Sequence, residues 1–213
     1  VIAACESEFQ DGSDSLFTAR NKHNITLRGY GAKFVMRKED YHQPPYTKTE
    51  WRHCLSLRGY QGIKVYGWLT VAATESTSRR GAGEDGSPHC QNIHIKDVAC
   101  DANYRQGISV ITAYNLLIEN CTLRQTEGTA PQAGIDFELN RTDEQLVNCV
   151  LRNCLNRTQR RLRYPDIYVP NLKEISEPIS IIVENCHVHQ NDSGASTKMP
   201  KLAVHISDKE IEA

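Results

Sequence analysis

The stretch NLLIENC, Asn115–Cys121, alternates apolar and polar residues and then reaches a residue type that favours tight bends. Leu116 and Ile118 lie two residues apart, which is the period of a β-strand with one buried face. Asn120 tolerates a left-handed backbone conformation, and Cys121 is again apolar. The pattern indicates a short strand, a bend and then another inward residue.

This pattern occurs six times along the chain, and successive copies begin 23 to 38 residues apart. The second and fourth positions are apolar or Cys in every copy, the sixth is Gly, Asp or Asn, and the seventh is a residue type that is commonly buried. The copies are NITLRGY from Asn24, GIKVYGW from Gly62, NIHIKDV from Asn92, NLLIENC from Asn115, NCVLRNC from Asn148 and SIIVENC from Ser180. One copy alone cannot bury its apolar side, so we expect the copies to stack in register. Asn residues at equivalent positions should then form hydrogen bonds along the stack.

Additional strand-like segments precede several copies. They are HCLSL (His53–Leu57), GISVI (Gly107–Ile111), GIDFE (Gly134–Glu138) and AVHIS (Ala203–Ser207). Two or more strands per repeat predict an all-β protein, a parallel β-helix (solenoid) of about six coils with protruding loops. The left-handed hexapeptide type is excluded because its short, strict period is absent. We expect a single domain over residues 1–213, which reads as a fragment of a longer secreted or extracellular protein that lacks its N-terminal cap.

Composition argues against several partner classes. The 213 residues carry a formal net charge of -1, which provides no electrostatic case for binding nucleic acid. No apolar run approaches the length of a membrane span. Cys121, Cys154 and Cys186 occupy the last position of three copies, where we expect buried free thiols. We expect a monomer that has neither nucleic acid nor a membrane as a partner.

The segment NYRQGISVITAYNLLIENCTLRQTEGTAPQAGIDFELN, Asn103–Asn140, resembles right-handed parallel β-helix proteins of the pectate-lyase-like superfold, of the secreted bacterial type. In those proteins an RQGISV strand is followed by GTAP-x-AGID-x-EPN. This chain departs from the pattern at Leu139, where Pro is usual, and at Gly83–Gly86, where GEDG replaces Gly-Gly-Asp-Gly. The resemblance implies a carbohydrate-active protein. It does not specify the reaction, because this superfold hosts lyases, hydrolases, epimerases and non-catalytic proteins.

Two carboxylates in the GIDFELN stretch are the candidate reacting groups. Asp136 and Glu138 alternate with apolar residues, so we expect both to face outward, about 6.5–7 Å apart along the strand. That spacing lies within the range of the carboxylate pairs of sugar-cleaving enzymes, nearer the inverting type. Arg105, one coil earlier, could hold a sugar carboxylate or keep Asp136 ionised. The competing interpretations are a solvated acidic face and an arginine that binds turn carbonyls.

Other candidate residues would line the same outer groove and contact the substrate. They are Gln106, Ser109, Asp85, Glu84, Trp51, Arg161 and Tyr164. Ser56 and His205 would share the outward column of Ser109 and Asp136. Tyr41 and Tyr46, in the insert that ends at Trp51, could stack on sugar rings. For Glu84 and Asp85 a turn is the alternative role, and for the Arg-rich insert a solvated loop. His94 is interpreted as a surface histidine.

These residues predict a protein that acts on a polysaccharide as a hydrolase, lyase or epimerase. An acidic glycan would suit Arg105. A hydrolase needs one protonated and one ionised carboxyl group. A lyase or epimerase needs a base together with Arg105 or a bound Ca²⁺, for which Asp and Glu are suitable ligands. No other cofactor is indicated. The alternative is a non-catalytic carbohydrate-binding, adhesive or structural β-helix module.

Overall fold

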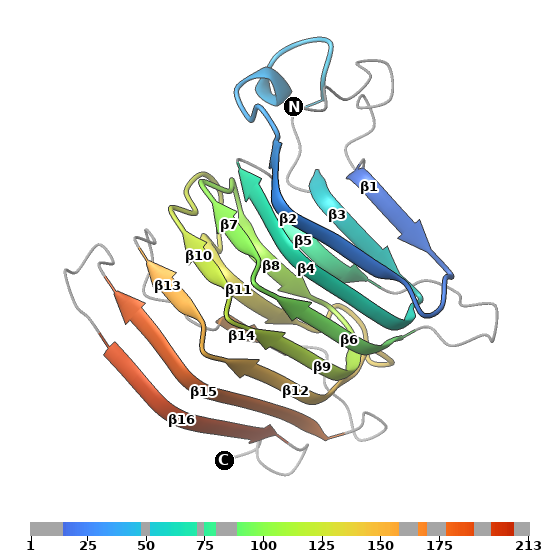
Figure 1. The fold of residues 1–213 in the computed structure, drawn as a ribbon, viewed down its shortest axis with the longest axis vertical. Helices are drawn as coiled ribbons and strands as arrows, with labels where there is room; N and C mark the ends of the chain where they lie inside the picture. The colour runs from blue at the N-terminus through green and yellow to red at the C-terminus, as the bar shows by residue number, and fades with distance from the viewer. Residues whose placement is uncertain are drawn as a thin grey trace.

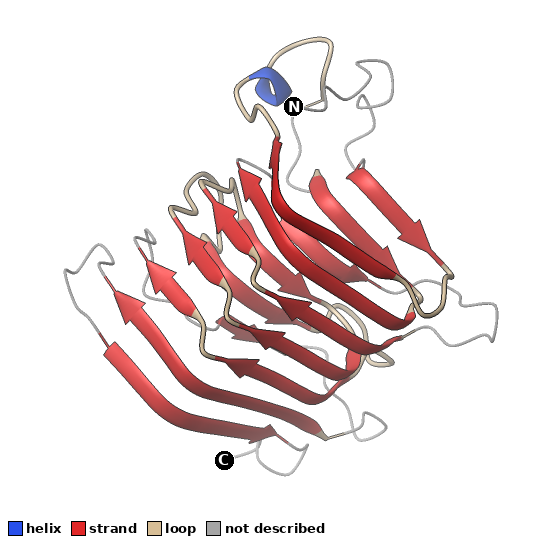
Figure 2. Cartoon of the chain, viewed as in Figure 1, coloured by secondary structure: helices blue, strands red, loops and turns tan. Residues whose placement is uncertain are grey.

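The computed structural model describes residues 15–47, 52–71, 75–79, 89–157, 166–169, 178–189 and 197–206. It is an all-β structure built on two sheets, and the helix found in these ranges is one 3-10 turn, η2 (Asp40–His42) (Figure 2). No helix with the length and hydrophobicity of a membrane span occurs among these residues.

The first sheet has six strands, and every pairing within it is parallel. Its order is β1 (Ser15–Arg20), β3 (His53–Arg58), β5 (Glu75–Arg79), β8 (Gln106–Val110), β11 (Ala133–Glu138) and β14 (Asp166–Tyr168). The predicted strands at His53, Gly107 and Gly134 are β3, β8 and β11, so they do lie in one sheet, with β8 next to β11 and β5 between β3 and β8.

The second sheet has ten strands and contains all six copies of the repeat. The copies form β2 (Thr26–Val35), β4 (Gln61–Val71), β6 (Cys90–Lys96), β9 (Ala113–Glu119), β12 (Leu146–Arg152) and β15 (Ile179–His189). The other strands are β7 (Ala99–Asp101), β10 (Thr122–Arg124), β13 (Leu155–Arg157) and β16 (Thr197–Ile206). Figure 1 shows the stack running from β1, β2 and β3 at one end to β15 and β16 at the other.

The repeats stack in the predicted register. Ile63 pairs with Ile93, Ile93 with Leu116, Leu116 with Cys149 and Cys149 with Ile181. The fourth positions pair in the same way from Leu27 to Val183. In the last three copies the side chains of both columns are at most 2% exposed. Like residues therefore pack on like residues, and neighbouring copies bury the apolar side that a single copy would leave in water.

Left-handed backbone residues mark both ends of the repeated strand. The first position has positive φ in five copies, and the sixth position in five copies as well. These residues are Asn24, Gly62, Asn92, Asn115 and Asn148, and then Gly67, Asp97, Asn120, Asn153 and Asn185. Asn148 Nδ2 donates to Asn115 Oδ1 at 2.8 Å, and Asn115 Nδ2 donates to Asn92 Oδ1 at 3.0 Å. The predicted hydrogen bonds along the stack are confirmed.

The first copy departs from the pattern. Its pairing with β4 shifts between Arg28 and Ala32, and Gly31 rather than Gly29 has a positive φ, of 82°. Tyr30 was expected to be buried and is 62% exposed. Phe34 takes the inward place, with its ring centroid 4.8 Å from that of Trp68. Two extra residues in β2 relative to β4 thus place the Tyr30 ring in solvent and the Phe34 ring against the core.

The final segment also differs from the prediction. Ala203–Ser207 was expected to join the column of strands that contains β3, β8 and β11. Instead β16 pairs antiparallel with β15 in the other sheet, with Ser180 opposite His205. The prediction that His205 shares an outward column with Asp136 is therefore wrong. Alternation alone indicates a strand but does not determine its direction or its partner.

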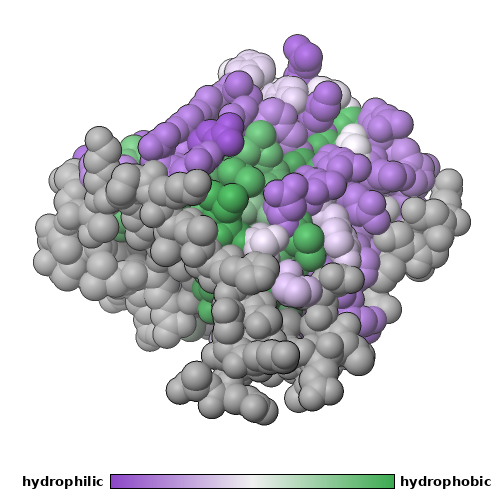
Figure 3. All heavy atoms as spheres, turned by 90° about the horizontal axis from the view of Figure 1, so that it is seen from below, coloured by the Kyte–Doolittle hydropathy of each residue, from purple (hydrophilic) through white to green (hydrophobic). Residues whose placement is uncertain are grey.

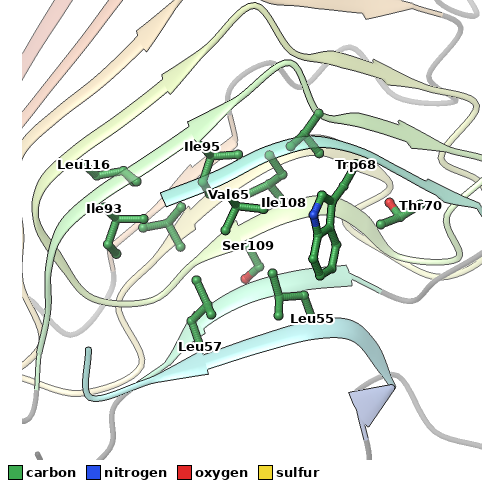
Figure 4. Close-up of a pocket in the computed structure, with 12 residues that line it drawn as sticks. Leu55, Leu57, Val65, Trp68, Thr70, Ile93, Ile95, Ile108, Ser109 and Leu116 are labelled. Atoms are coloured by element: carbon green, nitrogen blue, oxygen red, sulfur yellow. The ribbon is translucent and has the colours of Figure 1, made fainter. Parts of the chain in front are cut away.

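Apolar side chains of both sheets meet in one core, and a view turned from Figure 1 shows them as a band between polar flanks (Figure 3). The core contains a cavity of about 30 Å³, lined by Leu55, Leu57, Trp68 and other apolar residues, with Thr70 and Ser109 as the polar lining (Figure 4). This volume is about that of one or two water molecules. It is a packing void and not a substrate pocket.

All seven cysteines whose surroundings are described are buried free thiols. Cys121, Cys154 and Cys186 are at most 2% exposed, as expected for the last position of the repeat. Burial raises the pKa of Cys149 to about 12. These thiols therefore act as small apolar groups of the core.

Removing core volume from the stack should cost much more than the same change on its outer face. We expect Ile118→Ala, at a fully buried position, to lower the free energy of unfolding by about 3 kcal/mol through lost burial and a cavity. Leu117→Ala, at the neighbouring half-buried position, should cost about 1 kcal/mol or less. Urea denaturation followed by circular dichroism measures both, and equal losses would contradict the assigned register.

Candidate functional site

The predicted residues Arg105, Gln106 and Asp136 form a continuous chain of hydrogen bonds. Gln106 opens β8, and Asp136 lies in the neighbouring strand β11 opposite Ser109. Gln106 Nε2 donates to Asp136 Oδ2, and Arg105 Nη1 donates to Gln106 Oε1 at 2.7 Å. The guanidinium therefore reaches the carboxylate through an amide and not directly. Arg105 Nε also donates to the carbonyl of Ala130 at 3.1 Å, the role of a turn-binding arginine.

The expectation that this column of the six-stranded sheet faces solvent is wrong. Ser56 is 0% exposed, Ser109 1% and Asp136 3%, and Gln106 is also fully buried. Alternation correctly separates Asp136 from its apolar neighbours, but it cannot indicate which parts of the chain cover the polar side. Gln106 in this arrangement positions Asp136.

The turns that lead into β8 and β11 are bonded to each other. Glu127 N donates to Asn103 O at 2.8 Å, and Thr129 N donates to Tyr104 O at 3.0 Å. Gly134 then allows close packing, since a Cβ there would lie 2.6 Å from Asn156 Oδ1. The two turns and this close approach hold the start of β11 against its neighbours, which fixes the position of Asp136.

Glu138 is the accessible member of the carboxylate pair. It is partly exposed and lies opposite Tyr168, which is 56% exposed. Because Asp136 and Glu138 are two residues apart in one strand, their side chains project to the same side about 7 Å apart. The strand thus carries one buried, hydrogen-bonded carboxylate and one carboxylate beside an exposed aromatic ring.

Several predicted contact residues fall outside the described ranges. They are Glu84, Asp85, Trp51, Arg161 and Tyr164. Tyr41 and Tyr46 are described, and their ring centroids lie 5.1 Å apart. The guanidinium of fully buried Arg52 lies 5.2 Å from the Tyr41 ring and 5.4 Å from the Tyr46 ring. These two tyrosines therefore hold an arginine in place by cation–π contacts, which makes them part of the packed insert.

A second group of polar side chains was not identified from the sequence. Tyr66, His94 and Glu119 come from the adjacent strands β4, β6 and β9 of the ten-stranded sheet. The Tyr66 hydroxyl lies 3.0 Å from His94 Nδ1, and His94 Nε2 lies 3.0 Å from Glu119 Oε1. They occupy the third and fifth positions of three successive copies, which face away from the core. Comparing these outward positions between copies would have brought the three residues together.

Cations surround this Tyr–His–Glu relay. Lys96 Nζ lies 3.3 Å from Glu119 Oε1, and the Arg28 guanidinium carbon lies 5.9 Å from the centre of the Tyr66 ring. Burial alone would raise the pKa of the Glu119 carboxyl, but hydrogen bonds from His94 and Lys96 hold it below the ordinary value of 4.5. Glu119 is therefore ionised at neutral pH.

Across the described ranges, His, Cys, Asp and Glu side chains nowhere gather in a group of three or more that could hold a metal ion. Comparisons of the chain with protein families, with curated proteins and with solved structures find no match. The two polar sites described above are therefore the candidate sites of function.

Removing the amide that holds Asp136 should destabilise the fold. We expect Gln106→Leu to lower the free energy of unfolding by about 1–3 kcal/mol, because the buried Asp136 Oδ2 then loses the hydrogen bond from Gln106. Asp136→Asn retains an acceptor oxygen and should cost less. Gln43→Leu, at an exposed position, is the matched control, with an expected change within about 0.5 kcal/mol. Urea denaturation that shows no difference between the two leucine variants would contradict the role of Gln106.

The contribution of Glu119 should depend on pH. Its pKa is lower in the folded than in the unfolded chain, so its ionised form stabilises the fold above pH 4.5 and this stability is lost as the pH falls through the lower folded value. Glu119→Gln should be less stable than the wild type at pH 7, and the difference should shrink toward pH 3. Melting temperatures between these pH values measure this, with exposed Glu39→Gln as the control. A difference that is constant with pH would contradict the assigned ion pairs.

Proposed function

We propose that the chain is a right-handed parallel β-helix that hydrolyses a polysaccharide, with Asp136 and Glu138 as its carboxylate pair. The strand pairings support the coil interpretation. β4 pairs first with β6 and then, further along, with β7, and β15 pairs in the same way with β12 and β13. After β7, β10 and β13 the chain enters the six-stranded sheet as β8, β11 and β14, before the next repeat begins. The same order of strands, two in the ten-stranded sheet and then one in the six-stranded sheet, is repeated from β6 to β14.

The observation that carries the functional proposal is the contrast between the two carboxylates of β11. Asp136 is buried and accepts a hydrogen bond from Gln106, whereas Glu138 is partly exposed beside Tyr168. Carboxyl groups in different environments can divide the roles of acid and base in glycoside hydrolysis. Glu138 would contact the sugar, and the exposed Tyr168 ring offers a stacking surface. Their spacing of about 7 Å fits the inverting type.

Hydrolysis is favoured over elimination by the contacts of Arg105. A lyase acting on a uronate must neutralise the substrate carboxylate, and Arg105 was the candidate for that role. Two of its nitrogens instead donate to the Ala130 carbonyl and to Gln106. These two hydrogen bonds of Arg105 therefore help to position Asp136 and the neighbouring turn, and the nitrogens that make them are not available to a substrate carboxylate.

The alternative is a non-catalytic carbohydrate-binding module, and one observation favours it. Asp136 is only 3% exposed, so a polymer cannot reach this carboxylate directly in the present conformation. In a binding module Asp136 and Gln106 would be internal supports of the turn, and Glu138 and Tyr168 would belong to the binding surface.

A panel of neutral and uronate-rich polysaccharides, assayed with and without Ca²⁺, separates these functions. We expect the wild type to produce new reducing ends without unsaturated products. Glu138→Gln should lower this rate by about 100-fold or more, as for loss of a general acid or base. Glu39→Gln, which removes an exposed carboxylate outside β11 and the turn that leads into it, should retain the full rate.

Other results would change the assignment. Unsaturated ends would indicate a lyase. Products formed equally by the wild type and by Glu138→Gln would exclude Glu138 from the chemistry. If neither protein forms a product but the wild type is retained on one polymer, the binding module is the correct function.

A further inference from the structure

In the Tyr–His–Glu relay (Tyr66, His94 and Glu119) a hydroxyl is hydrogen-bonded to an imidazole, which is in turn hydrogen-bonded to a carboxylate. This is the arrangement that activates a hydroxyl as a nucleophile. Both nitrogens of the His94 ring are engaged at once, Nδ1 by the Tyr66 hydroxyl and Nε2 by the Glu119 carboxylate, each at 3.0 Å. Glu119, when ionised, can only accept, so Nε2 carries the proton. In the neutral ring, Nδ1 then has its lone pair toward the hydroxyl of Tyr66 and accepts from it.

This arrangement allows a proton to leave Tyr66. An imidazole that accepts from a hydroxyl and donates to a carboxylate can take the hydroxyl proton, because the carboxylate stabilises the imidazolium that forms. The relay lies on the outer face of the ten-stranded sheet, and all three residues are partly exposed. Unlike Asp136, it is open to a ligand from solvent.

We propose that Tyr66 is a nucleophile, activated by His94 and Glu119, that reacts with acyl or sulfonyl groups on negatively charged molecules. With an ester, a bond forms between Tyr66 Oη and the carbonyl carbon, and the bond from that carbon to the leaving oxygen breaks. The Tyr66 proton passes to His94 Nδ1 and then to the leaving oxygen. Water hydrolyses the tyrosyl ester and regenerates the phenol. This site is independent of the carboxylate pair of the six-stranded sheet.

The preference for an anionic molecule follows from the cations on this face. Arg28 and Lys96 lie directly beside Tyr66 in the sheet register, and Lys64 is exposed in the same strand. Lys96 also forms an ion pair with Glu119, whereas the Arg28 guanidinium lies over the Tyr66 ring itself. An anionic group could approach Tyr66 between these side chains with a favourable electrostatic contribution.

Tyr30 is an internal control for the proposal. Its hydroxyl donates to Asp97 Oδ2 at 2.7 Å, and its side chain is 62% exposed. The hydrogen bond to Asp97 is the main cause that raises the pKa of Tyr30, because a carboxylate favours the protonated phenol. Exposure alone predicts that Tyr30 reacts faster than Tyr66. The relay predicts the opposite order.

Labelling with 4-(fluorosulfonyl)benzoate tests this order. A bond forms between the tyrosine oxygen and sulfur, fluoride leaves, and the phenol proton passes to solvent, through His94 in the case of Tyr66. Peptide mass spectrometry gives the rate at each tyrosine. We expect Tyr66 to react faster than Tyr30, and faster with this probe than with neutral phenylmethanesulfonyl fluoride. His94→Gln should slow labelling of Tyr66 by roughly 100-fold, as for loss of a general base.

Two further variants test the role of the carboxylate. Glu119→Gln should also slow labelling of Tyr66, whereas Glu184→Gln, two strands away in the same outward column, should not. Thermal melting establishes that each variant is folded, and Glu119→Gln decides the outcome if His94→Gln does not fold. Equal rates at Tyr66 and Tyr30 would overturn the proposal. So would an unchanged rate at Tyr66 in a folded His94→Gln or Glu119→Gln protein.

Discussion

A left-handed backbone turn at the same place in successive repeats is the constraint on which the rest of this structure depends. Asn120 and Asn153, with φ of 55° and 52°, turn the chain at equivalent points, so the strands on either side superimpose. Few residue types adopt this conformation at low cost, and Asn can also form hydrogen bonds to the Asn of the next repeat. One residue type therefore sets both the bend and the alignment of neighbouring repeats.

Alignment of the bends has consequences for both faces of the sheet. Inside, Ile118 lies on Ile95 and Leu151, so the buried columns contain side chains of similar size. Outside, the same alignment brings polar residues of different repeats to adjacent positions. His94 contacts Tyr66 and Glu119 because of the alignment and not because of any proximity in sequence. The core and the polar relay are thus produced by one register.

The repeated strands and their columns could be predicted from the sequence because the relevant information is local. Period-two alternation and a bend residue lie within seven residues, and stacking then follows from the need to bury one side. The environment of Asp136 could not be predicted, because it depends on Gln106 from another strand and on a turn that contains Ala130. The exposure of Tyr30 and the direction of β16 were also missed. Each depends on an irregularity or a pairing partner that the repeat pattern does not contain.

The antiparallel strand β16 has a consequence for association between molecules. A stack of parallel strands ordinarily leaves its last strand with unpaired N–H and C=O groups, onto which a strand of another molecule can add. Here β15 pairs with β12 and β13 on one side and with β16 on the other. Another copy of the chain therefore cannot add to β15. The strand at this edge of the described sheet is β16, so a strand added here would pair with a reversed edge and would not continue the parallel register of the repeats.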